Sequence, residues 1–131
     1  MTLRLRDPFA DSVSLRQAMD RLVEQSLPRP DRGWLAVDVS ETPTELVTKT
    51  ALPGVKPEDV DITIEGDILT ITGERKADEE TQDTQYHRRE LYVGTFERAL
   101  RLPPRFQADK AMPVFEHGIL TLTIPRWRRR K

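Results

Sequence analysis

Apolar residues alternate with polar residues in several short runs, and this period of two constrains the chain more than any other feature. Side chains of a β-strand point to opposite faces in turn, so each run predicts a strand with one buried face. Pro and Gly separate the runs, and Gly66-Asp67 joins two of them as a hairpin. The sequence therefore predicts an all-β fold, an antiparallel β-sandwich over residues 34–125. The predicted strands are 34–39, 46–52, 60–65, 68–72, 96–102 and 119–124.

Residues 14–27 follow a different period, in which apolar positions recur at the spacing of one helix face. Ser14 and Gln17 have the spacing of a capping box, and Pro28 and Pro30 end the helix. A helix of about 12 residues is marginal alone in water, so its apolar stripe needs a partner surface. That surface is the body of the protein, another subunit or a bound protein. The stripe consists of Leu15, Ala18, Met19, Leu22 and Val23.

The segment between Gly73 and Gly94 is too polar for a core, because residues 77–85 include only one small apolar side chain. A connection of about 20 residues inside a sandwich usually has a function or strands of its own. The β-forming residues in 86–92 make that stretch the candidate strand.

Strict alternation in the predicted strand 96–102 places Arg98 on the same face as Phe96 and Leu100. A guanidinium on an apolar face needs a carboxylate, because breaking a buried ion pair costs about 3–5 kcal/mol. Two interpretations remain open. The side chain reaches water at the end of the strand, or it forms a buried or interfacial ion pair with Glu90 or Asp83.

The sequence motifs that mark the common classes of enzyme are missing. The chain has no Cys, which excludes disulfides and thiolate chemistry, and it contains no nucleotide-binding or serine-hydrolase motif. His87 and His117 are the only imidazoles, and neither has the spacing of a metal-ligand pair. The sequence therefore predicts no enzyme activity, no metal site and no cofactor.

The net charge of −1 hides an asymmetry, because five of the 21 basic residues lie in 126–131. Nucleic-acid-binding domains usually spread basic residues over one face, whereas this chain has an acidic body and a short basic tail. Nucleic acid is therefore not an expected partner. Aromatic Trp127 beside the basic residues leaves open a contact of the tail with nucleic acid or an anionic membrane. No apolar run approaches the ~18 residues of a membrane span, so membrane association is not expected. A cytoplasmic location is the expectation.

Six blocks of residues occur in an order that resembles the small heat shock proteins, the α-crystallin family, in its bacterial and plant branch. The resemblance covers roughly residues 33–125, the α-crystallin domain. The blocks are 37–41 (VDVSE), 51–60 (ALPGVKPEDV), 69–76 (LTITGERK), 86–88 (YHR), 94–98 (GTFER) and 118–120 (GIL).

This resemblance implies an immunoglobulin-like sandwich that dimerises and acts as an ATP-independent holdase for unfolding proteins. It divides the chain into a partly helical N-terminal arm (1–32), the α-crystallin domain (33–125) and a basic tail (126–131). In this branch the long loop carries a strand that pairs with the partner's first sandwich strand. The residues expected at the dimer interface are Trp34, Val37, Tyr86, His87, Arg88, Glu90 and Arg98.

Unfolding proteins are the expected clients, because burial of apolar surface drives their association without a cofactor. The residues expected to bind them are Phe9, Leu15, Met19, Leu22 and Val23. Packing of this stripe on the body is the alternative. A different class of function also remains open, a CS-domain-like adaptor or co-chaperone that binds one defined partner.

Two departures from the family's pattern affect assembly. The family usually has an Ile-x-Ile/Val anchor after the last strand, and here Ile124-Pro125 leads directly into the basic residues. Homodimers or other small oligomers are therefore expected. In addition, Pro113 stands where the family commonly has Ala, and a Pro in a strand indicates an edge or a bulge.

Overall fold

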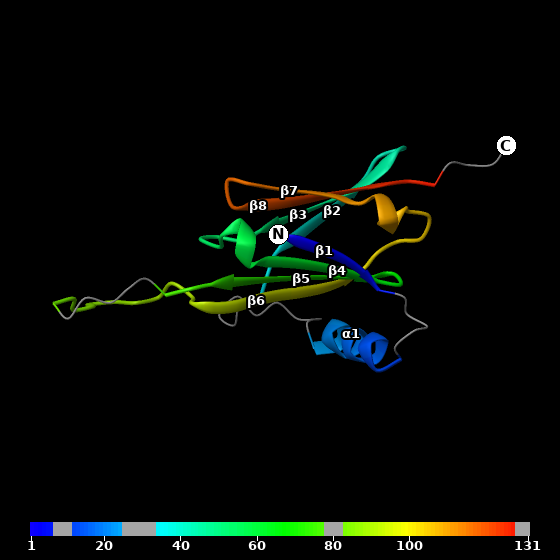
Figure 1. The fold of residues 1–131 in the computed structure, drawn as a ribbon. Helices are drawn as coiled ribbons and strands as arrows, with labels where there is room; N and C mark the ends of the chain where they lie inside the picture. Colours follow the sequence, from blue (N-terminus) through cyan, green and yellow to red (C-terminus); the bar gives the residue numbers. More distant parts are fainter. Residues whose placement is uncertain (7–11, 25–33, 78–82, 128–131) are drawn as a thin grey trace.

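Two four-stranded sheets pack face to face in the computed structural model, which describes residues 1–6, 12–24, 34–77 and 83–127 (Figure 1). Sheet A has the strand order β1-β4-β5-β6, and sheet B has the order β2-β3-β8-β7. Short 3-10 helices occur at Pro57–Asp59 and Ala108–Lys110. The other elements are β1 (Thr2–Arg6), α1 (Ser12–Glu24), β2 (Val37–Glu41), β3 (Glu45–Ala51), β4 (Val60–Glu65), β5 (Ile68–Arg75), β6 (Gly94–Arg101), β7 (Met112–Glu116) and β8 (Ile119–Pro125).

The alternating apolar residues fill the space between the two sheets, as the sequence predicts. Val60, Ile62 and Ile64 of β4 are fully buried, and they share one core with apolar residues of β3, β5 and β8. The predicted hairpin joins β4 to β5 through Gly66, whose φ of +61° glycine adopts without the steric cost that a Cβ brings. The predicted β-sandwich is therefore confirmed, and every described ladder except that of β1 is antiparallel.

The outer face of sheet A is covered by α1, which packs against β5 and β6 (Figure 1). Ala18 of the helix and Ala99 of β6 are both buried, and Arg21 Nε lies 3.2 Å from Glu97 Oε1. The predicted capping box is wrong, because the helix begins at Ser12 and Ser14 lies inside its first turn. Because α1 covers the outer face of sheet A, residues on both faces of β5 are buried. An alternating pattern with one apolar face does not predict this burial.

The strand β1 was not expected from the sequence, which indicated only a helix in the N-terminal arm. It pairs in parallel with β4, and Leu3 lies opposite Ile62. Leu3 also packs against the core, whereas Leu5 is 49% exposed. A five-residue strand whose partner lies far along the chain has no local signal besides its alternation.

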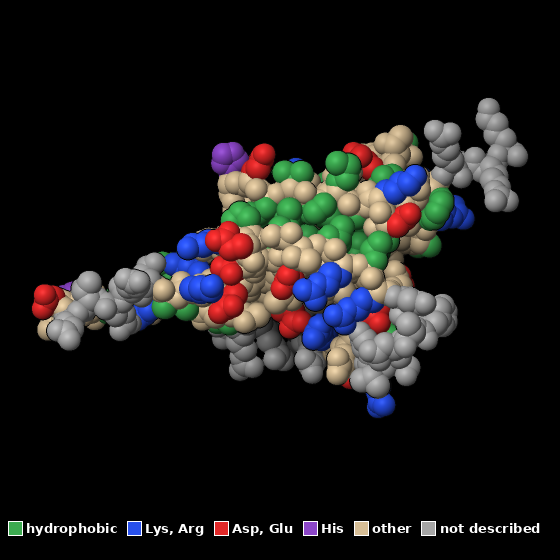
Figure 2. All heavy atoms as spheres, in the orientation of Figure 1, with side chains coloured by type: hydrophobic (Ala, Val, Ile, Leu, Met, Phe, Trp, Pro, Cys, Tyr) green, Lys and Arg blue, Asp and Glu red, His purple; other side chains and the backbone are tan. Residues whose placement is uncertain are grey.

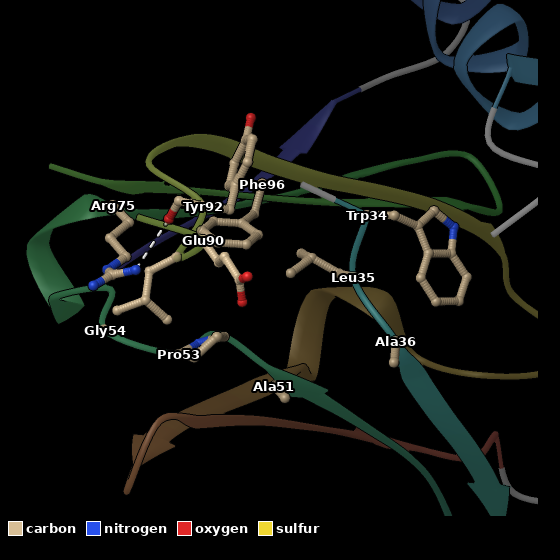
Figure 3. Close-up of a pocket in the computed structure, with 11 residues that line it drawn as sticks. Trp34, Leu35, Ala36, Ala51, Pro53, Gly54, Arg75, Glu90, Tyr92 and Phe96 are labelled. Atoms are coloured by element: carbon tan, nitrogen blue, oxygen red, sulfur yellow. Dashed lines mark hydrogen bonds between the residues drawn. The ribbon is translucent and has the colours of Figure 1, made fainter. Parts of the chain in front are cut away.

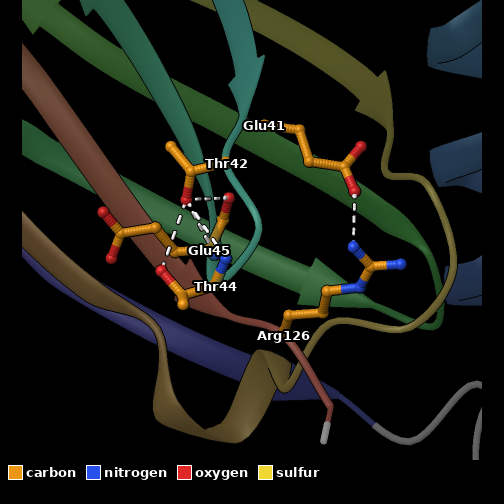
Figure 4. A network of polar contacts seen from close by, with 5 residues as sticks. All are labelled: Glu41, Thr42, Thr44, Glu45 and Arg126. Carbon is orange, nitrogen blue, oxygen red and sulfur yellow. Dashed lines mark hydrogen bonds and ion pairs between the residues drawn. The ribbon is translucent and has the colours of Figure 1, made fainter. Parts of the chain in front are cut away.

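The turn between β2 and β3 is closed by Thr42, whose Oγ1 accepts hydrogen bonds from the backbone N–H groups of Thr44 and Glu45 (Figure 4). Arg126 follows β8 and reaches the end of β2, where its Nη1 lies 3.6 Å from Glu41 Oε1. Its backbone N–H donates to the carbonyl of Thr44. The first residue of the basic segment is thus fixed to the sandwich.

Apolar side chains gather along the seam between the two sheets on the face drawn in Figure 2. The strands at the edges on this side of the sandwich are β1 in sheet A and β7 in sheet B. Pro113 lies in β7, so the prediction that it marks an edge strand is confirmed. No helix among the described residues is long and apolar enough to cross a membrane.

Candidate functional site

The opposite side of the sandwich, where β2 and β6 form the sheet edges, contains a groove of about 510 Å³ (Figure 3). Its walls come from segments far apart in the sequence: residues 34–36 and 90–92, with Ala51, Pro53, Gly54, Arg75 and Phe96. Most of these side chains are apolar, and Glu90 points into the space between them (Figure 3). The groove therefore combines apolar walls with one carboxylate.

Arg98 lies beside this groove on the inward face of β6, as the alternation predicts. Its Nη1 donates a hydrogen bond of 3.1 Å to the carbonyl of Leu35, and its Cζ lies 4.3 Å from the centroid of the Trp34 ring. Partial burial lowers the pKa of the guanidinium below its ordinary value. Among the described residues of this chain no carboxylate pairs with Arg98, so the predicted ion pair is not formed within one chain.

Two buried N–H donors at this place have no hydrogen-bond acceptor among the described residues. They are Trp34 Nε1 and Arg98 Nε. A buried donor without an acceptor costs about 1–3 kcal/mol. The pair therefore marks a position where an added acceptor would be stabilising.

Residues 83–93 leave the sandwich between β5 and β6 as an extended arm (Figure 1). No strand forms over 86–92, where the sequence predicts one, and none of the strands in the described part of the chain pairs with this stretch. Arg89 stacks on the ring of Tyr86, with Cζ 4.6 Å from the centroid, and Arg88 Nη1 lies 3.5 Å from Glu90 Oε1. Tyr86, His87 and Arg88 are exposed, and Leu91 is 72% exposed.

The root of the arm is held by contacts that the sequence did not indicate. The Tyr92 and Phe96 rings meet edge to face with their centroids 5.0 Å apart, and the Tyr92 hydroxyl donates to the carbonyl of Thr95. Arg75 Nη1 donates a hydrogen bond of 3.1 Å to the Tyr92 carbonyl. Arg75 also passes closely over Gly54, where an added Cβ would lie 2.8 Å from its Nε. In the sequence, these contacts leave no pattern beyond the presence of two aromatic residues, Tyr92 and Phe96, four positions apart.

The strand β2 forms one end of sheet B, and β3 is its only partner among the described strands. Of the alternating apolar residues in 34–39, Leu35 is buried in the core, Val37 is half-buried and Val39 is exposed. An edge strand presents unpaired N–H and C=O groups to any extended segment that approaches it. The β2 edge, the groove and Arg98 lie on the same side of the sandwich.

The apolar stripe of α1 is divided between two surroundings. Leu15 and Leu22 are half-buried beside the buried Ala18, whereas Met19 is 45% exposed and Val23 is 76% exposed. One half of the stripe therefore packs on the body, and the other half faces outward. Phe9 lies outside the described residues.

The described residues contain no group of three or more His, Asp or Glu side chains that could hold a metal ion. His117 lies in the turn between β7 and β8 with a φ of +55°, and His87 lies on the exposed arm. The described part of the chain offers edge strands, a groove, exposed apolar side chains and a stacked guanidinium.

Comparison with known proteins places this architecture among characterised relatives. Residues 38–131 match the model of the "Hsp20/alpha crystallin family". The chain is 38% identical over 128 residues to an 18.2 kDa class I heat shock protein of Medicago sativa, covering 95% of this chain and 78% of that protein. It is 40% identical over 89 residues to small heat shock protein C2 of Rickettsia felis, covering 68% of this chain and 58% of that protein.

A similar structure is that of a small heat-shock protein from Xylella fastidiosa, with a TM-score of 0.66 and 33% identity. The alignment covers 74% of this chain and 89% of that one. Heat shock protein 16.0 from Schizosaccharomyces pombe also has a TM-score of 0.66, with 30% identity over 74% of this chain and 93% of that one.

Proposed function

The chain belongs to the Hsp20/alpha crystallin family, the small heat shock proteins, which are non-enzymatic chaperones, and we propose that it acts as an ATP-independent holdase. It binds unfolding proteins and prevents their aggregation under stress. We further propose that it does so in the cytoplasm, since a chain without Cys suits a reducing compartment.

One observation carries the proposal for client binding. Met19 and Val23 are four residues apart on α1, and both are exposed while their neighbours Ala18 and Leu22 face sheet A. Residues at this spacing lie next to each other on a helix surface. Methionine is flexible and polarisable, which suits contact with many different apolar segments. Phe9 is proposed to extend this surface.

The experiment is to heat a labile enzyme with and without the protein and to follow light scattering. We expect scattering to fall at near-stoichiometric ratios without ATP. The double variant Met19→Ser/Val23→Ser should suppress aggregation several-fold less well, whereas Arg16→Ser/Asp20→Ser, which changes exposed polar residues of the same helix, should act like the unmodified protein. A requirement for ATP, or no effect of the protein on scattering, would contradict the holdase proposal.

The alternative is a CS-domain-like adaptor, and the choice of clients distinguishes the two. A holdase protects several unrelated enzymes, because exposed apolar surface is common to all unfolding chains. An adaptor with one defined partner protects none of them. Protection of at least three unrelated enzymes is therefore the expected result.

We propose that the functional unit is a homodimer in which the arm of one copy pairs with the β2 edge of the other. Two features support this arrangement. Among the residues that the structure describes, the β-forming residues of the arm have no partner strand, and β2 is paired on one side, with β3. Adding a strand to an exposed edge satisfies the backbone groups of both segments.

Within this dimer, Glu90 of the second copy is the proposed partner of Arg98. The arm brings its carboxylate to the side of the sandwich where Arg98 Nε and Trp34 Nε1 lack an acceptor. A carboxylate has lone pairs for both donors. Trp34 and Val37 of one copy and Tyr86, His87 and Arg88 of the other are proposed to complete the interface.

A further inference from the structure

Glu97 of β6 contacts both helix α1 and the segment that leads into β2. Its side chain faces α1, where Arg21 Nε lies 3.2 Å from Glu97 Oε1. Its backbone forms an isolated bridge with Trp34, on the side of β6 that forms the edge of sheet A. The next residue, Arg98, stacks on the Trp34 ring. The Glu97 carboxylate therefore lies between the helix that carries the proposed client surface and the place where a second copy is proposed to bind.

The charge of Glu97 matters because the group proposed to arrive from the second copy is also a carboxylate. Glu90 of the second copy is proposed to approach Arg98 Nε and Trp34 Nε1. Arg98 follows Glu97 directly, and Trp34 is the bridge partner of Glu97. Neighbouring residues of a strand are about 3.3 Å apart along it, whereas charges are screened only beyond about 8 Å at physiological salt. The negative charge of Glu97 therefore opposes binding of the incoming carboxylate.

Arg21 offsets this charge while α1 lies on sheet A. Among the described residues it is the cation that pairs with Glu97. The two side chains are 46% and 33% exposed, so water weakens their interaction without abolishing it. Of the described side chains of α1 only Ala18 is buried, and a segment with so little burial detaches at lower free energy than the core opens. When α1 detaches, Arg21 leaves with it.

We infer that Arg21 couples helix α1 to the dimer. With α1 docked, the Arg21 guanidinium neutralises Glu97 and favours binding of a second copy at Arg98 and Trp34, and with α1 detached the uncovered charge of Glu97 weakens that binding. This inference rests on the proposed arm interface. The coupling is reciprocal, because a second copy bound at this site favours the docked helix by the same free energy.

Trp34 provides a direct readout of binding at this site. The chain has two Trp residues, so Trp127→Phe leaves one indole. In this background the dimer is diluted, and its dissociation is followed by the emission of Trp34, whose Nε1 gains or loses an acceptor, and by sedimentation velocity. The variants are Arg21→Gln, Glu97→Gln and the double variant. Arg16→Gln is the control, because it removes the same charge from an exposed position of the same helix.

We expect Arg21→Gln to raise the dimer dissociation constant several-fold at low salt and by less at high salt, because salt screens the uncovered charge. Glu97→Gln should bind at least as tightly as the parent protein, since it removes the opposing charge. The double variant should return to the dissociation constant of the parent. Circular dichroism of each variant confirms that it is folded.

Two results would overturn the coupling. Equal weakening by Arg21→Gln and Glu97→Gln would mean that the ion pair acts only as a structural contact. Equal dissociation constants for Arg21→Gln and Arg16→Gln would mean that the pair has no influence on the dimer. Glu90→Arg separates this inference from the proposed interface. A dimer that persists in Glu90→Arg refutes the arm interface and the coupling with it, whereas a dimer that is weakened by Glu90→Arg but not by Arg21→Gln refutes the coupling alone.

Discussion

The guanidinium of Arg98 is stacked on the indole ring of Trp34, and its Nη1 is fixed by the carbonyl of the next residue, Leu35. The two contacts join β6 of sheet A to the segment that leads into β2 of sheet B. A cation thus occupies a place between the sheets where the alternation alone calls for an apolar side chain. Its Nε remains available to a partner.

Replacing Arg98 by Ala should lower the free energy of unfolding by about 2 kcal/mol, because it removes a stacked cation and a charged hydrogen bond. Arg98→Lys should lower the free energy of unfolding by a smaller amount, since the ammonium group keeps the charge but lacks the planar face that stacks on Trp34. The matched control is Arg101→Ala on the same strand, which breaks only an exposed ion pair with Asp67 and should cost less than about 1 kcal/mol. Urea unfolding measures all three, and equal losses for Arg98→Ala and Arg101→Ala would contradict the prediction.

Reversal of charge at Glu90 should weaken the dimer. Removing one partner of a buried charge pair costs about 2–5 kcal/mol, so Glu90→Arg should raise the dimer dissociation constant at least about tenfold. The double variant Glu90→Arg/Arg98→Glu should recover much of the affinity. Sedimentation velocity over a range of concentrations measures both. If Glu90→Arg leaves the dimer intact, Arg98 has a different partner.

Deletion of the arm should produce folded monomers. Removing residues 78–90 and closing the gap with a short turn keeps Tyr92, which packs on Phe96. We expect an unchanged sandwich by circular dichroism and a monomer mass by light scattering at low protein concentration. Persistence of dimers under those conditions would place the interface elsewhere.

Thr48→Val should stabilise the protein. Thr48 is completely buried in β3, and its Oγ1 has no hydrogen-bond partner among the described residues. Valine has nearly the same shape without the hydroxyl, so we expect the free energy of unfolding to rise by about 1 kcal/mol. Thr121→Val, at a half-buried position on the outer face of β8, is the control and should change stability by less. A lower melting temperature for Thr48→Val would mean that its hydroxyl has an acceptor.

Gly54→Ala should destabilise the root of the arm. Gly54 has a φ of +73°, which costs other residues about 1–2 kcal/mol, and the new Cβ would displace Arg75. Gly118→Ala has the same backbone strain at φ +75°, but its Cβ would meet no atom closer than 3.8 Å. The difference in melting temperature between the two variants isolates the contact with Arg75. Equal melting temperatures would show that Arg75 moves aside without cost.

The strands that could be predicted from the sequence are those with a complete alternating pattern and a buried partner. In β3, Leu46 and Thr48 are both buried, as the period of two requires, although Thr48 is polar. The β1 strand could not be predicted, because its pairing with β4 depends on contacts remote in sequence. The strand expected at 86–92 is absent for the opposite reason, since strand-forming residues make no strand until a second segment lies beside them.

The candidate site also has features that the sequence predicts and features that it does not. The inward direction of Arg98 follows from alternation, but its contacts with Trp34 and the Leu35 carbonyl do not, because they join segments more than sixty residues apart in sequence. The helical stripe was recognised as apolar, whereas its division into a packed half at Leu15 and Leu22 and an exposed half at Met19 and Val23 depends on how α1 lies on sheet A.

The strand order of sheet B has a consequence for how the protein is made. Sheet A closes its β4–β5 hairpin from neighbouring residues, but β3 lies between β2 and β8. During synthesis, the edge of β3 that pairs with β8 therefore stays unpaired until all of sheet A and then β8 have left the ribosome. Throughout that interval the nascent chain exposes the kind of apolar strand edge that leads to aggregation. A protein proposed to protect others from aggregation is itself at risk of it until one of its latest strands is in place.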